Sequence, residues 1–239
     1  MNRQPLPTGL PTPRFPVDPW RLVETEYCDD DLGHTETLFA LGNGYLGMRA
    51  NPEEGRNAHS HGTYLNGFHE TWEIEHAEDA YGFAKTGQTM VNVPDGTIIK
   101  LYVDDEPFFL PTANLAHFER TLDMRRGVLE RDVLWETAVG KQVAIRSRRF
   151  VSFPHRHITA ISYEVTVLIA EAPVVISSEI LTRASVVAES EDPRGARRFA
   201  WKVLMPQMHL GLEERLMYGM KARNSEMTLA CGAEHDVHT

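Results

Sequence analysis

The side chains best suited to chemistry lie close together between residues 69 and 76. Two histidines and three glutamates occupy this run: His69, Glu70, Glu73, Glu75 and His76. Imidazole and carboxylate groups spaced by one helical turn can hold a divalent metal, but their order here is not the His-Glu-x-x-His of zinc-dependent hydrolases. We therefore predict a solvated acidic loop and no metal site.

Two pairs of histidines raise the same question. His59 with His61, and His155 with His157, would each place two imidazoles on one side of an extended strand. Such a pair could chelate a metal or bind an anion. Exposed loop histidines are much commoner than ligands, so we expect no metal at either pair.

Sugar binding is the chemistry that the residues just before this run suggest. Aromatic rings cover the C–H patches of a sugar, while amide and carboxylate groups bind its hydroxyls. If residues 64–72 are extended, five suitable side chains share one face: Tyr64, Asn66, Phe68, Glu70 and Trp72. The alternative, favoured by burial statistics, is that the three aromatic residues belong to the hydrophobic core.

A hairpin precedes these candidate residues. Apolar runs lie on both sides of Gly42-Asn43-Gly44, from Leu38 to Met48, and predict two paired strands. Asn-Gly tolerates the positive φ angles of a type I′ turn, whose twist suits a hairpin. We therefore predict a type I′ hairpin here.

A second hairpin is predicted over residues 118–135. Phe118, Leu122 and Met124 share one face by the period of two, and Arg126-Gly127 forms the turn. Further strands are predicted at residues 142–147, 161–167, 174–176, 199–204 and 227–232, with a polar loop at 189–195. Many short strands without βαβ alternation predict an all-β sandwich of two large antiparallel sheets.

Residues 210–221 are ambiguous. Leu212, Leu216 and Met220 recur every four residues, which is typical of a helix. Tyr218-Gly219 disfavours a helix, because glycine is a poor helix former.

Composition excludes several classes of protein. With 239 residues, 42% hydrophobic and 24% charged, the chain can bury a large core. A formal net charge of −10 without a basic stripe argues against nucleic-acid binding, and no apolar stretch is long enough to cross a membrane. Cys28 and Cys231 are expected to be free thiols, and the start lacks a secretory signal, so we expect a cytoplasmic protein.

The N-terminal region has a different composition from the rest. Six of the 14 prolines lie in the first 19 residues, at positions 5, 7, 11, 13, 16 and 19. Proline blocks regular strand pairing, so residues 1–19 are predicted to form an extended segment and residues 20–239 the folded domain.

The first hairpin also has a distinctive amino-acid sequence. Leu38-Phe39-Ala40-Leu41-Gly42-Asn43-Gly44-Tyr45-Leu46-Gly47-Met48-Arg49 resembles the signature of the N-terminal domain of glycoside hydrolase family 65, which includes maltose, trehalose and kojibiose phosphorylases and related hydrolases. Segments similar to family blocks follow the family order: 20–24, 36–39, 53–55, 62–68 and 122–129. The likeness runs from about Trp20 to Thr182. One departure is Ala50, where members usually have glycine, and where a Cβ would be awkward if φ were positive.

The resemblance implies a super-β-sandwich of the galactose-mutarotase type, incomplete at its C-terminal edge. In family members this domain precedes an (α/α)6 barrel, in which a glutamate protonates the glycosidic oxygen of an α-linked glucosyl disaccharide while phosphate or activated water attacks. The resemblance therefore implies that this chain has no catalytic residue, needs no cofactor or metal, and is inactive alone. Its expected partners are its own C-terminal barrel, the disaccharide, possibly phosphate, and a second copy in a homodimer.

Two other readings remain open. The chain could be a stand-alone carbohydrate-binding module, or a purely structural dimerisation domain. An unfinished sheet would expose unpaired backbone groups on its edge, which predicts self-association or a frayed C-terminus.

Six residues of the two hairpins are predicted to have structural roles. A charged residue inside a sheet needs a partner, so we expect a buried arginine–aspartate pair to join the two hairpins. The six are Gly42, Asn43, Gly44, Arg49, Asp123 and Arg125.

Overall fold

The structure, a computed structural model, describes residues 13–55, 61–76, 78, 80–169, 171–182 and 203–239. Almost all regular structure in these residues is strand. The elements in chain order are β1 (Arg21–Glu24), η1 (Asp29–Asp31), α1 (Leu32–Leu38), β2 (Leu41–Gly42), β3 (Leu46–Met48), β4 (Thr63–Glu73), β5 (Thr86–Asn92), β6 (Asp95–Val103), β7 (Glu106–Pro107), β8 (Asn114–Asp123), β9 (Val128–Glu136), β10 (Gln142–Val151), β11 (Thr159–Val167), β12 (Val174–Leu181), β13 (Leu204–Leu212), β14 (Arg215–Ala222) and β15 (Thr228–Glu234).

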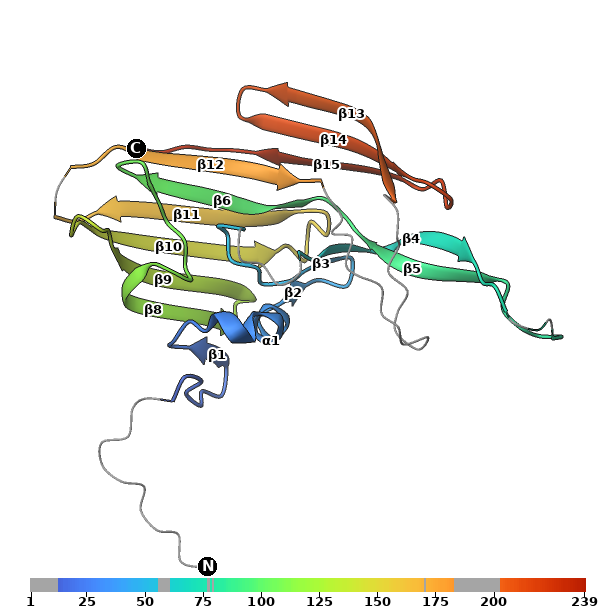
Figure 1. The fold of residues 1–239 in the computed structure, drawn as a ribbon, viewed down its shortest axis with the longest axis horizontal. Coiled ribbons are helices and arrows are strands. Elements are labelled where there is room, and N and C mark those ends of the chain that lie inside the picture. The colour runs from blue at the N-terminus through green and yellow to red at the C-terminus, as the bar shows by residue number, and fades with distance from the viewer. Residues whose placement is uncertain (1–12, 56–60, 77, 79, 170, 183–202) are drawn as a thin grey trace, which may run out of the picture.

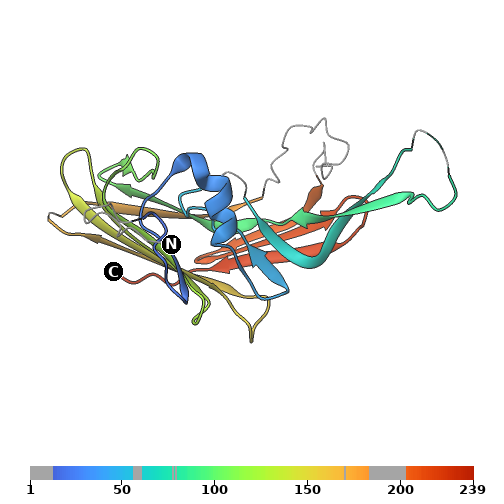
Figure 2. The same ribbon diagram turned by 90° about the horizontal axis from the view of Figure 1, so that it is seen from below.

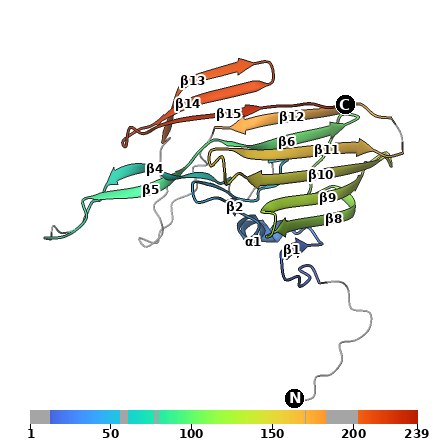
Figure 3. The same ribbon diagram turned by 180° about the vertical axis from the view of Figure 1, so that it is seen from behind.

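The strands form antiparallel sheets that pack as a sandwich, which confirms the predicted fold class. The sheets have the strand orders β1-β8-β9-β10-β11, β12-β6-β7, β13-β14-β15 and β2-β3-β4-β5. Figure 2 shows β6 and β12 as a separate layer beside the five-stranded sheet. The β4–β5 hairpin extends as an arm beyond the body of the sandwich in all three ribbon views (Figures 1–3).

The main core lies between the five-stranded sheet and β6. Residues of β9 and β10 alternate between buried and half-exposed positions, as expected for strands with one face on a core. Val133, Trp135, Val143 and Ile145 on that face pack with Leu101 and neighbouring residues. Trp135 is 2% exposed, so its indole reports directly on this core.

A second core joins the arm to the β13-β14-β15 sheet. Phe68 from β4 and Val91 from β5 pack against Leu204, Met220 and Leu229. Beyond this core both faces of β13 are largely exposed, and Met205, Met208, Leu210, Leu212 and Met217 are among the exposed large apolar residues.

The first predicted hairpin is present but differs in its turn. Leu41 pairs with Met48 and Gly42 with Gly47, whereas Leu38 ends α1. Only Gly44 has a positive φ, of 86°, so the turn is not type I′. Asn43 acts through its side chain instead, because its Oδ1 accepts hydrogen bonds from the backbone N–H groups of Tyr45 and Leu46.

The second predicted hairpin is confirmed, but Met124 was assigned to the wrong face. β8 and β9 pair from Asp123–Val128 onward, and Gly127 takes φ 65° in the turn. β8 ends at Asp123, so Met124 lies in the turn and is 56% exposed instead of joining Phe118 on the inner face.

The ambiguous segment 210–221 is not a helix. It forms the end of β13 and most of β14, with a turn in which Glu213 has φ 47°. The spacing of four residues does not indicate a helix here, because Leu216 and Met220 belong to one strand of the hairpin and Leu212 belongs to the other.

Other sequence predictions are confirmed, wrong or outside the described residues. The predicted strands at 142–147, 161–167, 174–176 and 227–232 correspond to β10, β11, β12 and β15. The predicted loop 189–195 and residues 199–202 lie outside the described residues. Residues 69–73 belong to β4 and are not a loop. Ala50 does not have a positive φ, so the departure from glycine costs no strain there.

Two residues of the proline-rich segment before Trp20 contact the rest of the domain. Arg14 donates hydrogen bonds to Glu24 and Asp31, and Phe15 packs against the cluster that contains Phe39. No helix in the described part of the chain is long and apolar enough to span a membrane.

Candidate functional site

The five predicted sugar-binding residues do not share one face. Tyr64 pairs with Asn92, but His69 pairs with Met90, so β4 contains extra residues between these two points. Gly67 takes φ 84° in this irregularity. The extra residues of this bulge interrupt the alternation of side chains between the two faces of β4. Tyr64 and Asn66 lie before the interruption, and the regular run begins again at Phe68.

Two of the five side chains are buried in the interior of the domain. Phe68 is 5% exposed in the second core. Glu70 is fully buried, and its carboxylate accepts hydrogen bonds from the N–H groups of Asn224 (3.0 Å) and Ser225 (2.7 Å) in the β14–β15 turn. Burial alone would raise the pKa of Glu70, but these backbone donors lower it. Glu70 therefore joins β4 to the turn instead of facing a ligand.

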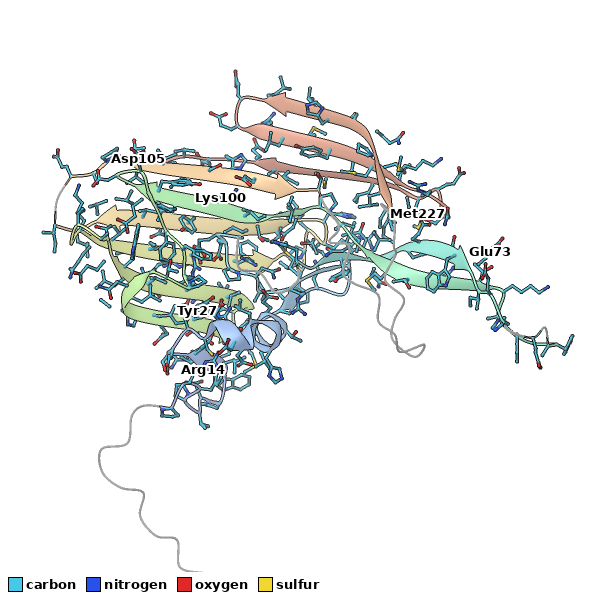
Figure 4. The ribbon with its side chains drawn as sticks, viewed as in Figure 1. Arg14, Tyr27, Glu73, Lys100, Asp105 and Met227 are labelled. Atoms are coloured by element: carbon cyan, nitrogen blue, oxygen red, sulfur yellow. The ribbon has the colours of Figure 1, made fainter. Side chains whose placement is uncertain are left out.

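The other three side chains are partly accessible. Asn66 donates a hydrogen bond to the carbonyl of Gly44 at 3.0 Å, which links the arm to the first hairpin. The Trp72 ring lies against Gly87 of the paired strand, where a Cβ would collide with the indole. Tyr64 and Trp72 are half-buried, and Figure 4 shows Glu73, next to Trp72, out on the arm.

Only one of the two predicted histidine pairs is fully described, because His59 lies outside the described residues. His61 lies 2.9 Å from Asp95 through its Nδ1, and that hydrogen bond raises the pKa of His61 while burial opposes it. His155 and His157 lie in the exposed turn between β10 and β11, not on a strand. Within the described residues, no group of three or more possible ligands is assembled.

A buried ionic cluster is the most polar feature of the interior. Arg131 of β9 donates to both carboxylate oxygens of Glu54, at 2.9 and 2.7 Å, and lies 3.0 Å from Glu53. Arg149 of β10 donates to Glu53 at 2.9 Å. All four side chains are at most 5% exposed.

The cluster continues toward the N-terminus. Arg120 of β8 donates to Glu24 of β1 through two nitrogens, at 2.9 and 2.5 Å. Arg14 contacts the other oxygen of the same carboxylate at 2.5 Å. We refer to Glu24, Glu53, Glu54, Arg120, Arg131 and Arg149 as the ionic cluster.

Glu53 of the ionic cluster does not have the protonation properties of a glycosidase general acid. Burial alone would raise the pKa of Glu53, but the charges of Arg131 and Arg149 lower it to about 2. A glycosidase general acid needs a raised pKa, because it must hold a proton near neutral pH. The adjoining cavity, lined in part by Tyr27, Glu53 and Arg131, has a volume of about 10 Å³ and is too small for a sugar.

Sequence reasoning missed this cluster, although a signal was present. Arg131 falls in phase with Leu129, Val133 and Trp135, and Arg149 in phase with Ile145. A charged residue at an inward position of an alternating strand requires a buried partner.

The predicted pair between the two hairpins is absent. Arg49 donates instead to Glu36 of α1 at 3.2 Å and to Thr37 at 2.8 Å. Asp123 accepts hydrogen bonds from the N–H groups of Arg125 and Arg126 in its own turn. The guanidinium of Arg125 lies 4.4 Å from the centre of the Trp20 ring.

Asn43 forms side-chain hydrogen bonds to residues far away in the sequence. Its Nδ2 donates to the carbonyls of Ser152 (2.6 Å) and Arg156 (3.0 Å) in the β10–β11 turn. Gly42 and Gly44 allow the close hairpin that presents Asn43, Gly44 through its positive φ. These residues therefore fix one end of the five-stranded sheet.

Comparison with known proteins identifies the family. Residues 22–239 match the family model described as "Glycosyl hydrolase family 65, N-terminal domain". The chain belongs to this family. The domain is 39% identical over 223 residues to an uncharacterized glycosyl hydrolase of Mycobacterium tuberculosis (strain ATCC 25618 / H37Rv), covering 93% of this chain and 28% of that protein.

Relatives of this family 65 domain include named enzymes. It is 38% identical over 229 residues to the alpha,alpha-trehalose phosphorylase of Thermoanaerobacter brockii, covering 93% of this chain and 29% of the enzyme. A solved structure titled "Putative kojibiose phosphorylase from human microbiome" has the same fold, with a TM-score of 0.74 at 21% identity, covering 93% of this chain and 28% of that one. The chain thus spans less than a third of the length of these relatives.

Proposed function

We propose that this domain is the non-catalytic N-terminal part of a longer enzyme that cleaves an α-linked glucosyl disaccharide. The attacking group would be phosphate or water, and the catalytic carboxylates would lie in a separate (α/α)6 barrel. The observation that carries the proposal is the match of residues 22–239 to the family 65 N-terminal domain. The paired, buried state of Glu53 and Glu54 supports it, because neither carboxylate is free to act on a substrate.

The test is to follow the reading frame past Thr239 and to assay the longer product. Maltose, trehalose and kojibiose are each incubated with and without phosphate. Release of glucose 1-phosphate only with phosphate indicates a phosphorylase, whereas release of glucose without phosphate indicates a hydrolase. Absence of both products from all three sugars would contradict the proposal for these substrates.

Within that enzyme, the arm is proposed to shape the mouth of the substrate pocket. Trp72 and Tyr64 are the aromatic candidates that the structure leaves partly exposed, and the arm reaches beyond the sandwich (Figure 3). Trp72→Ala in the longer enzyme should raise KM with little change in kcat. Met90→Ala is the control, because Met90 is an exposed side chain on the paired strand. A KM unchanged from the wild type in the Trp72 variant would remove this role.

A carbohydrate-binding module is the second candidate, and one groove favours it. A groove of about 550 Å³ lies between residues 25–27 and 110–119 and contains Tyr27, His117 and Glu119. This volume is within the range of small-molecule sites, and the groove combines an aromatic ring with polar groups. Calorimetric titration of the 239-residue chain with maltose and trehalose decides the question, and His117→Ala should abolish any heat that arises in the groove.

Homodimerisation is a further part of the proposal. Met208, Leu210, Leu212 and Met217 form an exposed apolar face on β13 and β14, and β15 is the adjacent edge strand. Light scattering at high concentration should give the mass of a dimer, and Leu212→Asp should return the monomer mass. A monomeric wild type would argue against this role.

A further inference from the structure

The two signature hairpins, far apart in the sequence, lie at the same end of the five-stranded sheet. Phe150 pairs with Val128, so the β8–β9 and β10–β11 turns leave the sheet at the same end. Asn43 then ties the first hairpin to the β10–β11 turn through the carbonyls of Ser152 and Arg156. Figure 1 shows β10 pointing toward β2 and β3 at this end.

This end exposes a mixture of aromatic, apolar and cationic side chains. Phe153 is 73% exposed and Met124 is 56% exposed. Tyr45 lies between two neighbours, with the His157 ring 4.6 Å away and the Arg156 guanidinium 4.8 Å from its ring centre. We call Tyr45, Met124, Arg125, Phe153, Arg156 and His157 the signature end. Aromatic residues, methionine and arginine are the types enriched in protein interfaces.

The charge of the signature end differs from that of the whole chain. The chain has a formal net charge of −10. Among the described residues, Arg125 and Arg156 have no carboxylate partner within ion-pair distance. On the same sheet, Arg146 has one such partner and Arg148 has two. The signature end is therefore an uncompensated cationic patch on an acidic domain, and its complement is a surface that carries carboxylates.

The opposite end of the same sheet lacks these properties. The β9–β10 turn at residues 137–141 exposes Val139, but its Lys141 is paired with Asp104. The turn at residues 137–141 contains no aromatic residue. The two ends thus provide a matched comparison within one sheet.

We infer that the signature end docks against an acidic surface of the catalytic region that follows this domain in a longer protein. The inference rests on the proposed function. Two relatives extend far beyond the domain, since this chain covers only 28% and 29% of their lengths. Docking there would cover Phe153 and Met124 and would give Arg125 and Arg156 the carboxylate partners that the domain itself does not supply.

Hydrogen exchange tests the surface directly. Amide exchange is compared between the longer protein and the 239-residue chain, at residues 43–46, 124–127 and 153–158. We expect exchange at these three segments to slow by about tenfold or more in the longer protein, while residues 138–140 stay unchanged. Equal exchange in the two proteins at the signature end, or slowing only at residues 138–140, would overturn the inference.

Charge reversal provides the second test. Arg125→Glu with Arg156→Glu in the longer protein should return exchange at the signature end to within about twofold of the isolated chain. Arg146→Glu with Arg148→Glu makes the same change in charge away from the turns and should preserve the slow exchange. Both double variants of the 239-residue chain are checked by circular dichroism and urea unfolding, so that a folding defect is recognised.

The two levels of the proposal fail separately. A longer protein that cleaves a disaccharide but exchanges freely at the signature end refutes the docking surface alone. A protein with a protected signature end and no activity on the three sugars refutes the proposed reaction alone.

Discussion

Replacing Arg131 by methionine should be among the most destabilising single changes in this domain. Its guanidinium makes a bidentate pair with Glu54 and a contact of 3.0 Å with Glu53. Without it, the described structure leaves Glu54 with only the Tyr163 hydroxyl, at 3.3 Å. Removal of one partner of a buried ion pair costs about 3–5 kcal/mol, because the remaining charge is uncompensated.

The measurement is urea unfolding of the 239-residue chain, followed by the fluorescence of the buried Trp135. Arg146→Met is the control, since the exposed pair between Arg146 and Asp132 should be worth less than about 1 kcal/mol. The double variant Arg131→Met with Glu54→Met removes both charges and should be more stable than Arg131→Met alone.

Two results would refute this reasoning. The Arg131 variant could lose no more stability than the Arg146 control, in which case the ionic cluster would not be desolvated. Alternatively, the double variant could cost the sum of its single variants, in which case the two side chains would not be coupled.

Three further predictions concern single sites. Gly44→Ala should lower the free energy of unfolding by about 1–2 kcal/mol, because a side chain at φ 86° is strained even though the space around it is open. Gly47→Ala is the control in the same urea unfolding assay. It should be nearly neutral, because Gly47 also faces open space but has an ordinary φ. The hydrogen bond to Asp95 raises the pKa of His61, so the contribution of His61 to stability is present below pH 6.5 and is lost as the pH rises through the higher folded pKa. His61→Gln should therefore flatten the loss of stability that the wild type shows above pH 6.5. Glu70→Gln should cost about 1–3 kcal/mol in the same unfolding assay, by weakening the cap of the β14–β15 turn.

The alternation of apolar residues was sufficient to predict most of the sandwich. β9 and β10 follow the period of two without interruption, because one face packs on the core and the other faces solvent. The same rule failed at β4, where the bulge near Gly67 changes which residues share a face. Sequence periodicity assumes a regular strand, so it cannot show an extra residue in a ladder whose partner is unknown.

The side-chain partners were harder to predict than the strands. Arg49 and Asp123 were expected to meet because both lie in signature hairpins, yet each satisfies its charge locally, in α1 and in its own turn. The helix α1 itself was missed, because the apolar residues Leu38 and Phe39 were assigned to the hairpin. Partner choice depends on which segments the sheets bring together, and that information is not local.

The ionic cluster explains how the signature hairpin is held in place. The chain that leaves the hairpin, residues 49–55, has no regular structure and is largely buried, so its carbonyls need donors from outside. Arg149 donates to the carbonyls of Arg49 (3.3 Å) and Asn51 (3.1 Å), and Arg120 donates to that of Ala50 (3.3 Å). Apolar residues at these inward positions would leave those carbonyls unsatisfied, so the charge is not a replaceable form of packing.

This arrangement couples the core to the surface that we propose to dock. The arginines of β8 and β10 hold residues 49–51, and Asn43 holds the β10–β11 turn, so the first hairpin is fixed from both sides. A preorganised surface loses less conformational entropy on association than one that must order first. If the signature end docks as we propose, the buried arginines would contribute to docking by keeping the first hairpin in place before the partner binds.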